Sequence, residues 1–262
     1  MTQKPKYGIG LDLGSTSTKA MLIDRERRVL GSHLLPTGAS AVGAAERCLE
    51  AIAIQAPIDV SRSITISTGY GRSVIESADR NITEITCHSV GVNHLNPDIR
   101  LLIDVGGQDS KVIRIGAKGR PEDFELNDKC SAGTGRFLEV MAGVLEVPLK
   151  DFGNLALGST DPCEISNTCT VFAESEVIGH IGAGKRAEDI AAGIHASMAA
   201  KIASLSKRIR STGPLGLTGG VALNPAFVHY LSIELGEDIW VPEEPQMTGA
   251  LGAAILALDE GD

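Results

Sequence analysis

Apolar and polar positions alternate in short blocks at the start of the chain, a pattern that predicts β-strands joined by tight turns. The apolar stretch that ends at Leu13 is followed by the turn Gly14–Thr16. A second apolar run, Ala20–Ile23, leads into the polar turn Asp24–Arg28. We therefore expect the order strand, turn, strand, turn, strand in this region.

Longer segments with apolar residues at helical spacing follow, and they alternate with further short apolar runs. The segments that predict helices are residues 41–56, 133–146, 170–181, 187–210, 225–235 and 249–258, with a helix start at 73–79. The short runs that predict strands are residues 64–67, 82–87, 215–217 and 239–241. Strands that alternate with helices indicate an α/β fold.

The chain contains an internal repeat. Residues 11–19 read Leu-Asp-Leu-Gly-Ser-Thr-Ser-Thr-Lys, and residues 103–111 read Ile-Asp-Val-Gly-Gly-Gln-Asp-Ser-Lys. Each copy is followed by another strand-like run and a turn, so the match extends into the same succession of elements. We therefore predict two similar lobes, the first from residues 1–97 with 246–262 and the second from residues 98–245.

Composition and charge narrow the class of protein. Apolar residues make up 43% and charged residues 22% of the 262 residues, so the chain can bury a core, and its 3% aromatic share leaves that core to aliphatic side chains. The net charge of −9 argues against nucleic acid or an anionic membrane as a partner. No apolar run approaches the roughly 18–20 residues of a membrane span, and the chain start does not resemble a signal peptide. We expect a cytoplasmic protein.

Each copy of the repeat places an aspartate two residues before a glycine, where a predicted strand ends. A glycine there lets backbone N–H groups approach an anion, and the hydroxyls of Ser15 and Thr16 add donors without bulk. Asp12 and Asp104 would then flank a phosphate chain and could hold Mg²⁺ through its water ligands. In either copy alone, an aspartate that merely closes a turn is the commoner case, but two matching copies favour a phosphate site.

A third glycine segment, Thr218–Gly220, follows a short strand and precedes a helix, where a ligand can approach the backbone closely. With the two Asp–Gly turns, it resembles the actin, sugar-kinase and chaperone ATPase superfamily, in which two ribonuclease H-like lobes close on ATP in the cleft between them. The resemblance implies catalytic roles for Asp12, Asp104 and Gln108, with Mg²⁺ near the two aspartates and Gln108 orienting the attacking water. The residues implied as nucleotide contacts are Gly14, Ser15, Thr16, Lys19, Gly106, Gly107, Gln108, Gly133, Thr218, Gly219 and Gly220.

Two of the five cysteines, Cys130 and Cys169, each come just before a predicted helix. The unpaired N–H groups and partial positive charge of a helix N-terminus favour thiolate over thiol. Two thiolates cannot complete the four-cysteine shell of a [4Fe–4S] cluster, but a twofold dimer would bring four together. Spacing alone also fits two small buried core residues, which is the commoner role of a free cysteine.

Four segments closely resemble the activator component of 2-hydroxyacyl-CoA dehydratases: Asn127–Glu139, Ser166–Glu176, Thr68–Arg72 and Asp104–Asp109. The likeness runs from about residue 7 to residue 258, and related subunits occur in benzoyl-CoA reductases. It implies a cytosolic, oxygen-sensitive homodimer with ATP in each subunit. It also implies one [4Fe–4S] cluster held by Cys130 and Cys169 of both subunits.

The function implied by this resemblance is that of an ATP-driven one-electron activator. A reduced ferredoxin or flavodoxin would donate the electron, and an iron–sulfur dehydratase acting on a 2-hydroxyacyl-CoA would accept it. Two alternatives stay open: a sugar or acid kinase of the same superfamily without a cluster, and a nucleotide-binding regulatory subunit without hydrolysis. The remaining cysteines, Cys48, Cys87 and Cys163, match no ligand position. Cys163 could nevertheless lie in a loop near a cluster.

Overall fold

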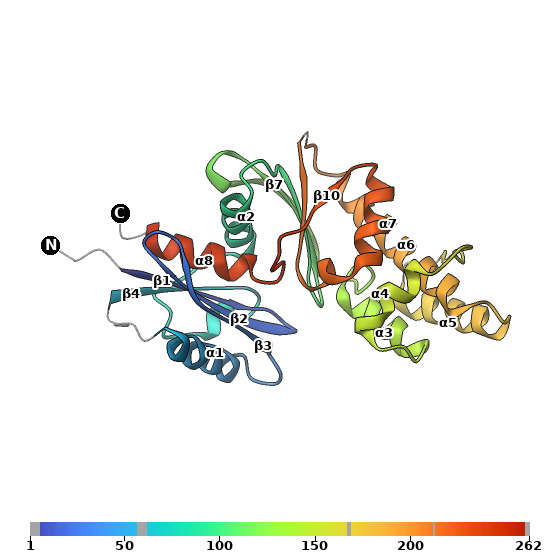
Figure 1. Cartoon of the computed structure of the whole chain (residues 1–262), viewed down its shortest axis with the longest axis horizontal. Helices are drawn as coiled ribbons and strands as arrows, with labels where there is room; N and C mark the ends of the chain where they lie inside the picture. The colour runs from blue at the N-terminus through green and yellow to red at the C-terminus, as the bar shows by residue number, and fades with distance from the viewer. Residues whose placement is uncertain (1–5, 57–61, 167–168, 212, 260–262) are drawn as a thin grey trace. The chain divides into compact units, whose positions relative to one another are not determined.

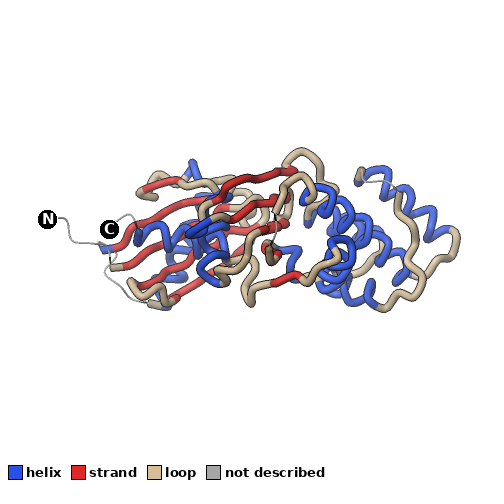
Figure 2. The backbone as a smooth tube through the Cα atoms, turned by 90° about the horizontal axis from the view of Figure 1, so that it is seen from above, coloured by secondary structure: helices blue, strands red, loops and turns tan. Residues whose placement is uncertain are grey.

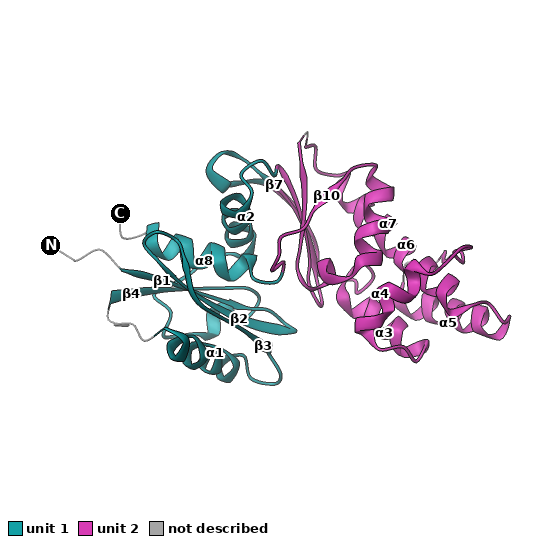
Figure 3. Ribbon diagram, viewed as in Figure 1, with its two compact units in different colours: residues 1–99, 115–122, 246–262 teal, residues 100–114, 123–245 magenta. Residues whose placement is uncertain are grey.

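The computed structural model describes the chain except for residues 1–5, 57–61, 167–168, 212 and 260–262. The chain divides into two compact units (Figures 1 and 3). Unit 1 comprises residues 1–99, 115–122 and 246–262, and unit 2 comprises residues 100–114 and 123–245. Helices and strands occur in both, blue and red in Figure 2, which confirms the predicted α/β class.

Unit 1 is built on a five-stranded sheet in the order β3-β2-β1-β4-β5. Strand β1 pairs antiparallel with β2 and parallel with β4. The first three strands follow one another in the chain, as the alternating pattern predicted. The strands are β1 (Tyr7–Leu13), β2 (Ser17–Asp24), β3 (Val29–Pro36), β4 (Ser63–Thr68) and β5 (Arg80–Asn81).

The main helices of unit 1 are α1 (Ala41–Gln55), α2 (Glu84–Leu95) and α8 (Thr248–Asp259). Helix α8 packs closely on β1 because Gly8 and Gly10 leave room for its backbone, where a Cβ atom would overlap the carbonyls of Ala254 and Ala250. The predicted strand over residues 82–87 is wrong. Residues 84–87 form the first turn of α2, which is capped by Thr83. The helix start predicted at residues 73–79 shortens to a 3-10 turn, η2 (Arg72–Val74), and a second such turn is η3 (Ala117–Gly119).

Unit 2 repeats this sheet topology in the order β10-β9-β6-β7-β8. Strand β6 pairs antiparallel with β7 and parallel with β9, just as β1 pairs with β2 and β4. The internal repeat in the sequence therefore corresponds to a repeat in structure. The strands are β6 (Leu101–Val105), β7 (Ser110–Ile115), β8 (Pro121–Asn127), β9 (Leu215–Thr218) and β10 (Ile239–Trp240).

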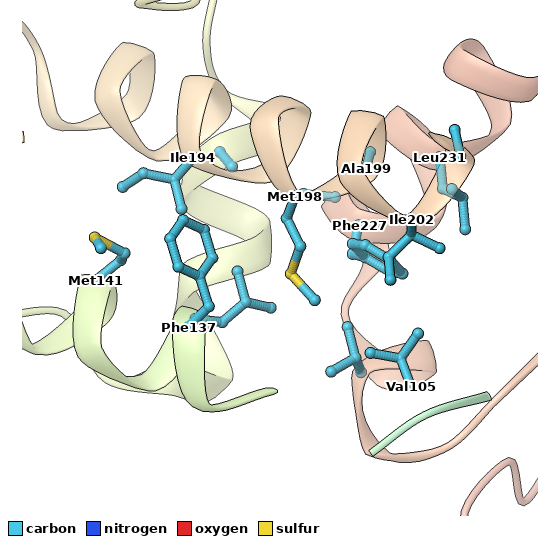
Figure 4. Close-up of a cluster of buried hydrophobic side chains, with 14 of the residues drawn as sticks. Val105, Phe137, Met141, Ile194, Met198, Ala199, Ile202, Phe227 and Leu231 are labelled. Atoms are coloured by element: carbon cyan, nitrogen blue, oxygen red, sulfur yellow. The ribbon is translucent and has the colours of Figure 1, made fainter. Parts of the chain in front are cut away.

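The helices of unit 2 bury a hydrophobic core around α6 that is mostly aliphatic, as the composition predicted, but also contains Phe137, Phe152 and Phe227. Figure 4 shows Phe137 of α3 beside Met198 of α6, with Val105, from the end of β6, in the same cluster. This packing fixes the strand end that carries the second copy of the repeat. Among the described residues, no helix is both long and apolar enough to cross a bilayer. The helices are α3 (Gly135–Val144), α4 (Leu149–Leu157), α5 (Thr170–Gly182), α6 (Ala187–Ser206), the short η4 (Gly220–Leu223) and α7 (Pro225–Leu235).

Candidate functional site

The first copy of the repeat forms the β1–β2 hairpin and pairs its aspartate with its lysine. Asp12 and Lys19 are partners in the strand register, and Lys19 Nζ lies 3.0 Å from Asp12 Oδ2. The Gly14 N–H donates to the Ser17 carbonyl at 3.1 Å and closes the turn, which leaves Ser15–Thr16 exposed. The Asp12 carboxylate is thus buried with its charge compensated.

The second copy forms the β6–β7 hairpin and makes the same pair. Lys111 Nζ lies 3.3 Å from Asp104 Oδ2 and 2.6 Å from Asp109 Oδ2. Thr218 Oγ1, at the end of β9, donates to Asp104 Oδ1 at 2.9 Å. The structure therefore brings the aspartate of the second turn together with the third glycine segment. Lys111 was not among the residues predicted for the site, although its alignment with Lys19 in the repeat could have indicated it.

The turn of this hairpin contacts the segment that contains Gly133. The Gly106 N–H donates to the Asp109 carbonyl at 3.0 Å and closes the turn, and Gln108 is exposed on it. The Gly106 carbonyl accepts a 2.8 Å hydrogen bond from the N–H of Gly135, at the start of α3. The Gly106–Gln108 turn and the segment of Gly133 therefore lie together at one end of the unit 2 sheet.

The third glycine segment crosses the end of β6 at close range. Gly219 has a φ of 87°, and a Cβ atom at this position would overlap the carbonyl of Val105. Its N–H donates to the Pro245 carbonyl at 2.9 Å, and η4 begins at the next residue, Gly220. Only glycine fits this conformation and this approach, and the chain thus passes close to Asp104 and reaches the surface at Gly220, which is exposed.

A histidine that the sequence did not indicate lies beside the first aspartate. His88 Nδ1 is 2.9 Å from Thr248 Oγ1. A Cβ atom on Gly249 would lie 3.0 Å from His88 Nε2 and 3.1 Å from Asp12 Oδ2, so both groups border the same small space. His88 and Thr248 are 160 residues apart in the chain, and no local motif connects them.

The two candidate cluster cysteines are both exposed. Cys169 is the N-cap of α5, next to the unpaired N–H groups of its first turn; residues 167 and 168 before it lie outside the described part of the chain. Cys130 differs from the expectation, because α3 begins only at Gly135. Cys130 lies instead in a turn held by the Asn127 side chain, whose Nδ2 donates to the Cys130 carbonyl at 3.0 Å.

A hydrogen bond joins the segments of the two cysteines. The hydroxyl oxygens of Ser131 and Thr170, each the residue after a cysteine, lie 2.7 Å apart. Throughout the described residues, no group of three or more His, Cys, Asp or Glu side chains is arranged to hold a metal ion. Two thiols are half of the four that a [4Fe–4S] cluster takes.

Comparison with known proteins assigns the family. The sequence profile of the BadF/BadG/BcrA/BcrD ATPase family matches residues 9–257. The chain belongs to this family. The 2-hydroxyisocaproyl-CoA dehydratase activator of Clostridioides difficile is 43% identical to this chain over 257 residues, which are 97% of this chain and 96% of that protein. The (R)-2-hydroxyglutaryl-CoA dehydratase activating ATPase of Acidaminococcus fermentans is 40% identical over 252 residues, 96% of each chain.

A solved structure supports the same assignment. The activator of the 2-hydroxyisocaproyl-CoA dehydratase from Clostridium difficile, with bound ADPNP, matches this chain with a TM-score of 0.91 and 42% sequence identity, over 97% of this chain and 95% of that chain. The expected family and the two-lobed fold of the actin and sugar-kinase type are confirmed. The kinase alternative is less supported, because these relatives are named as dehydratase activators.

The other cysteines of this ATPase are buried. Burial raises the pKa of Cys48 to about 11 and that of Cys87 to about 12. Burial also raises the pKa of Cys163, whose N–H donates to the Asp189 carbonyl. Since the thiolate is the form that binds metal, these three buried thiols are poor candidates for ligands.

Proposed function

We propose that this chain is an ATP-driven one-electron activator of an iron–sulfur dehydratase that acts on a 2-hydroxyacyl-CoA. The observation that carries the proposal is the Ser131–Thr170 hydrogen bond. It holds two exposed cysteine segments together in the same unit as the Asp104–Thr218 pair. The relatives support the proposal, since two are named as activators of 2-hydroxyacyl-CoA dehydratases and one was solved with ADPNP.

The nucleotide roles follow from the two hairpins. Asp12 and Asp104 would hold Mg²⁺ through water, and the N–H groups of their turns would contact the phosphates. Ser15, Thr16 and Lys19 would add contacts in unit 1, and the segments of Gly133 and Thr218–Gly220 would bind the nucleotide in unit 2. Gln108 is exposed on its turn and would orient the attacking water, so that catalysis rests on positioning and charge stabilisation.

Cys130 and Cys169 would hold a [4Fe–4S] cluster together with the same two residues of a second copy. When bound, the cluster would supply a low-potential one-electron carrier. The chain's own part is to fix the two thiols, through the hydroxyl bond of Ser131 and Thr170. The N–H groups at the start of α5 would stabilise negative charge beside Cys169.

A second copy of the chain is the partner that the surface of α5 favours. Four large apolar side chains of this helix are exposed: Val171 (67%), Phe172 (63%), Ile178 (54%) and Ile181 (42%). The helix begins directly after Cys169, so a dimer that shares the cluster would also cover these side chains. The ferredoxin or flavodoxin donor, the oxygen sensitivity and the cytoplasmic location stay predictions.

The test is iron and acid-labile sulfide per subunit, with mass in solution, on protein purified without oxygen. We expect about two irons per subunit in a dimer and Mg²⁺-dependent ATP hydrolysis. Cys130→Ala and Cys169→Ala should each lose iron, whereas Cys163→Ala, a buried cysteine nearby in the sequence, should keep it. An iron-replete double variant of Cys130 and Cys169 would contradict the ligand assignment.

A further inference from the structure

The start of α3 is bonded to the turn of the β6–β7 hairpin. The N–H groups of Gly135 and Arg136 donate to the carbonyls of Gly106 and Gly107, each at 2.8 Å. The described peptide bonds are all trans, so the carbonyl and the N–H of each peptide unit point in opposite directions. The same two peptide units therefore offer the N–H groups of Gly107 and Gln108 away from α3. A phosphate that reorients those N–H groups must also move the carbonyls that hold α3.

A second set of hydrogen bonds continues from α3 to the cysteine segments. Thr134, the N-cap of α3, donates through Oγ1 at 2.7 Å and through its N–H at 3.0 Å to the Ser131 carbonyl. The Ser131 hydroxyl then bonds to the hydroxyl of Thr170, the first residue of α5. One continuous path thus runs from the hairpin turn to the residues that follow Cys130 and Cys169.

The hydroxyl bond ties the start of α5 to the Cys130 turn, whereas the side-chain hydrogen bonds farther along α5 run elsewhere: Glu176 accepts from Ser166, and His180 bonds to the Glu164 carbonyl. Ala173 and Val177 of this helix are buried in the hydrophobic core of unit 2, and such contacts are not directional. A hydrogen bond at 2.7 Å constrains both distance and angle. Removal of the bond would leave α5 packed in the core and bonded to residues 164–166, but without this directional constraint between its first residue and the Cys130 turn.

We infer that Ser131 and Thr170 are positioning residues, which transmit a change at the Gly106–Gly107 turn to the start of α5 and so keep the two thiols moving as a pair. The inference rests on the proposed function, in which nucleotide binds at that turn. Coupling of this kind is reciprocal. If bound nucleotide changes the affinity of the two thiols for their ligand by some factor, then a ligand bound at the thiols should change the affinity for nucleotide by the same factor.

Hydrogen–deuterium exchange on iron-free protein tests the link without the cluster. With Mg²⁺ and ADPNP, we expect exchange in the wild type to slow severalfold in peptides covering residues 133–139 and 169–175. In the variant Ser131→Ala with Thr170→Val, the slowing should persist in the first peptide and disappear in the second. Ser175→Ala is the matched control, because its hydroxyl donates only within α5, to the Val171 carbonyl, and it should behave as the wild type.

Equal slowing of the second peptide in the variant and the wild type would overturn the inference, as would no slowing there in the wild type. ADPNP affinity and iron content, measured on the same proteins, test the proposed function separately. In the iron-loaded protein, the reduction potential should shift with nucleotide in the wild type and in Ser175→Ala. It should shift much less in the Ser131→Ala and Thr170→Val variant at unchanged iron content, and an equal shift counts against the link.

Discussion

His195 makes the stability of unit 2 depend on pH. The side chain is fully buried in α6, and its Nδ1 lies 2.7 Å from the Ala191 carbonyl. A carbonyl can only accept, so Nδ1 carries the hydrogen, and Nε2 accepts from Asn224 Nδ2 at 3.0 Å. Asn224 in turn caps α7 through the N–H of Phe227. The neutral imidazole is therefore built into the hydrogen bonds that join α6 to the capped start of α7.

Burial lowers the pKa of His195 from 6.5 to about 4. Between these values the unfolded chain binds a proton that the folded chain does not, so the free energy of unfolding must rise with pH over this window. The full difference corresponds to about 3 kcal/mol, at 1.36 kcal/mol per pKa unit. About 2 kcal/mol of it should be lost when the pH falls from about 7 to about 5.

Urea unfolding at these two pH values measures this loss. The fluorescence of Trp240, the single tryptophan, follows unit 2 because the residue lies in β10. We expect the wild type to lose about 2 kcal/mol more than His195→Gln between the two conditions, while His229→Gln, at an exposed histidine, behaves as the wild type. An equal loss in the wild type and His195→Gln would refute the reasoning.

Three further predictions concern the sites. Gly219→Ala should destabilise unit 2 by ~1–3 kcal/mol and weaken ADPNP binding. Gly236→Ala, also at positive φ but in open space, should leave ADPNP binding intact. Equal ADPNP binding by the two variants would count against the site. Lys111→Met removes the cation that pairs with the buried Asp104 carboxylate and should lower the free energy of unfolding by ~3–5 kcal/mol, measured with urea. The added substitution Asp104→Asn should recover part of this loss. No recovery would show that the unpaired charge is not the cause. Iodoacetamide should modify two cysteines of the folded iron-free protein and all five only after unfolding, and mass spectrometry that finds a third in the folded state would contradict the burial argument.

Local signals explain why much of the fold could be predicted. The helix over Pro225–Leu235 has the predicted bounds, because Asn224 caps its start, proline occupies its first turn and Gly236 ends it in the left-handed conformation. The error at residues 82–87 has an equally local cause. A short apolar run does not distinguish a strand from a helix, and here the cap at Thr83 and the packing of Gly91 against α8 decide for the helix.

The repeat and the glycine segment Thr218–Gly220 were local signals for the nucleotide residues, and the structure brings Thr218 to Asp104. The repeat placed Asp12 and Asp104 at equivalent strand ends, and both turned out to pair with the lysine across their hairpin. The Ser131–Thr170 bond could not be predicted, since it joins residues 39 positions apart and depends on how α3 and α5 pack. The sequence placed Cys130 just before a helix, whereas the structure starts α3 only at Gly135, after Thr134 as its N-cap, and leaves Cys130 in the preceding turn.

The two hairpins share the Asp–Lys pair but differ in what holds their turns. In unit 1, the Thr16 carbonyl accepts from the N–H of Thr37, so that turn is tied to the end of β3 in its own sheet. In unit 2, the turn carbonyls accept from the first residues of α3. This helix is not part of the five-stranded sheet topology that the two units share. Under the proposed function, both turns would bind phosphate, but only the second connects that event to the thiols. Duplication would thus have supplied the ATP site, and the segment carrying Cys130 and Cys169, added to one lobe only, would have given it a redox output.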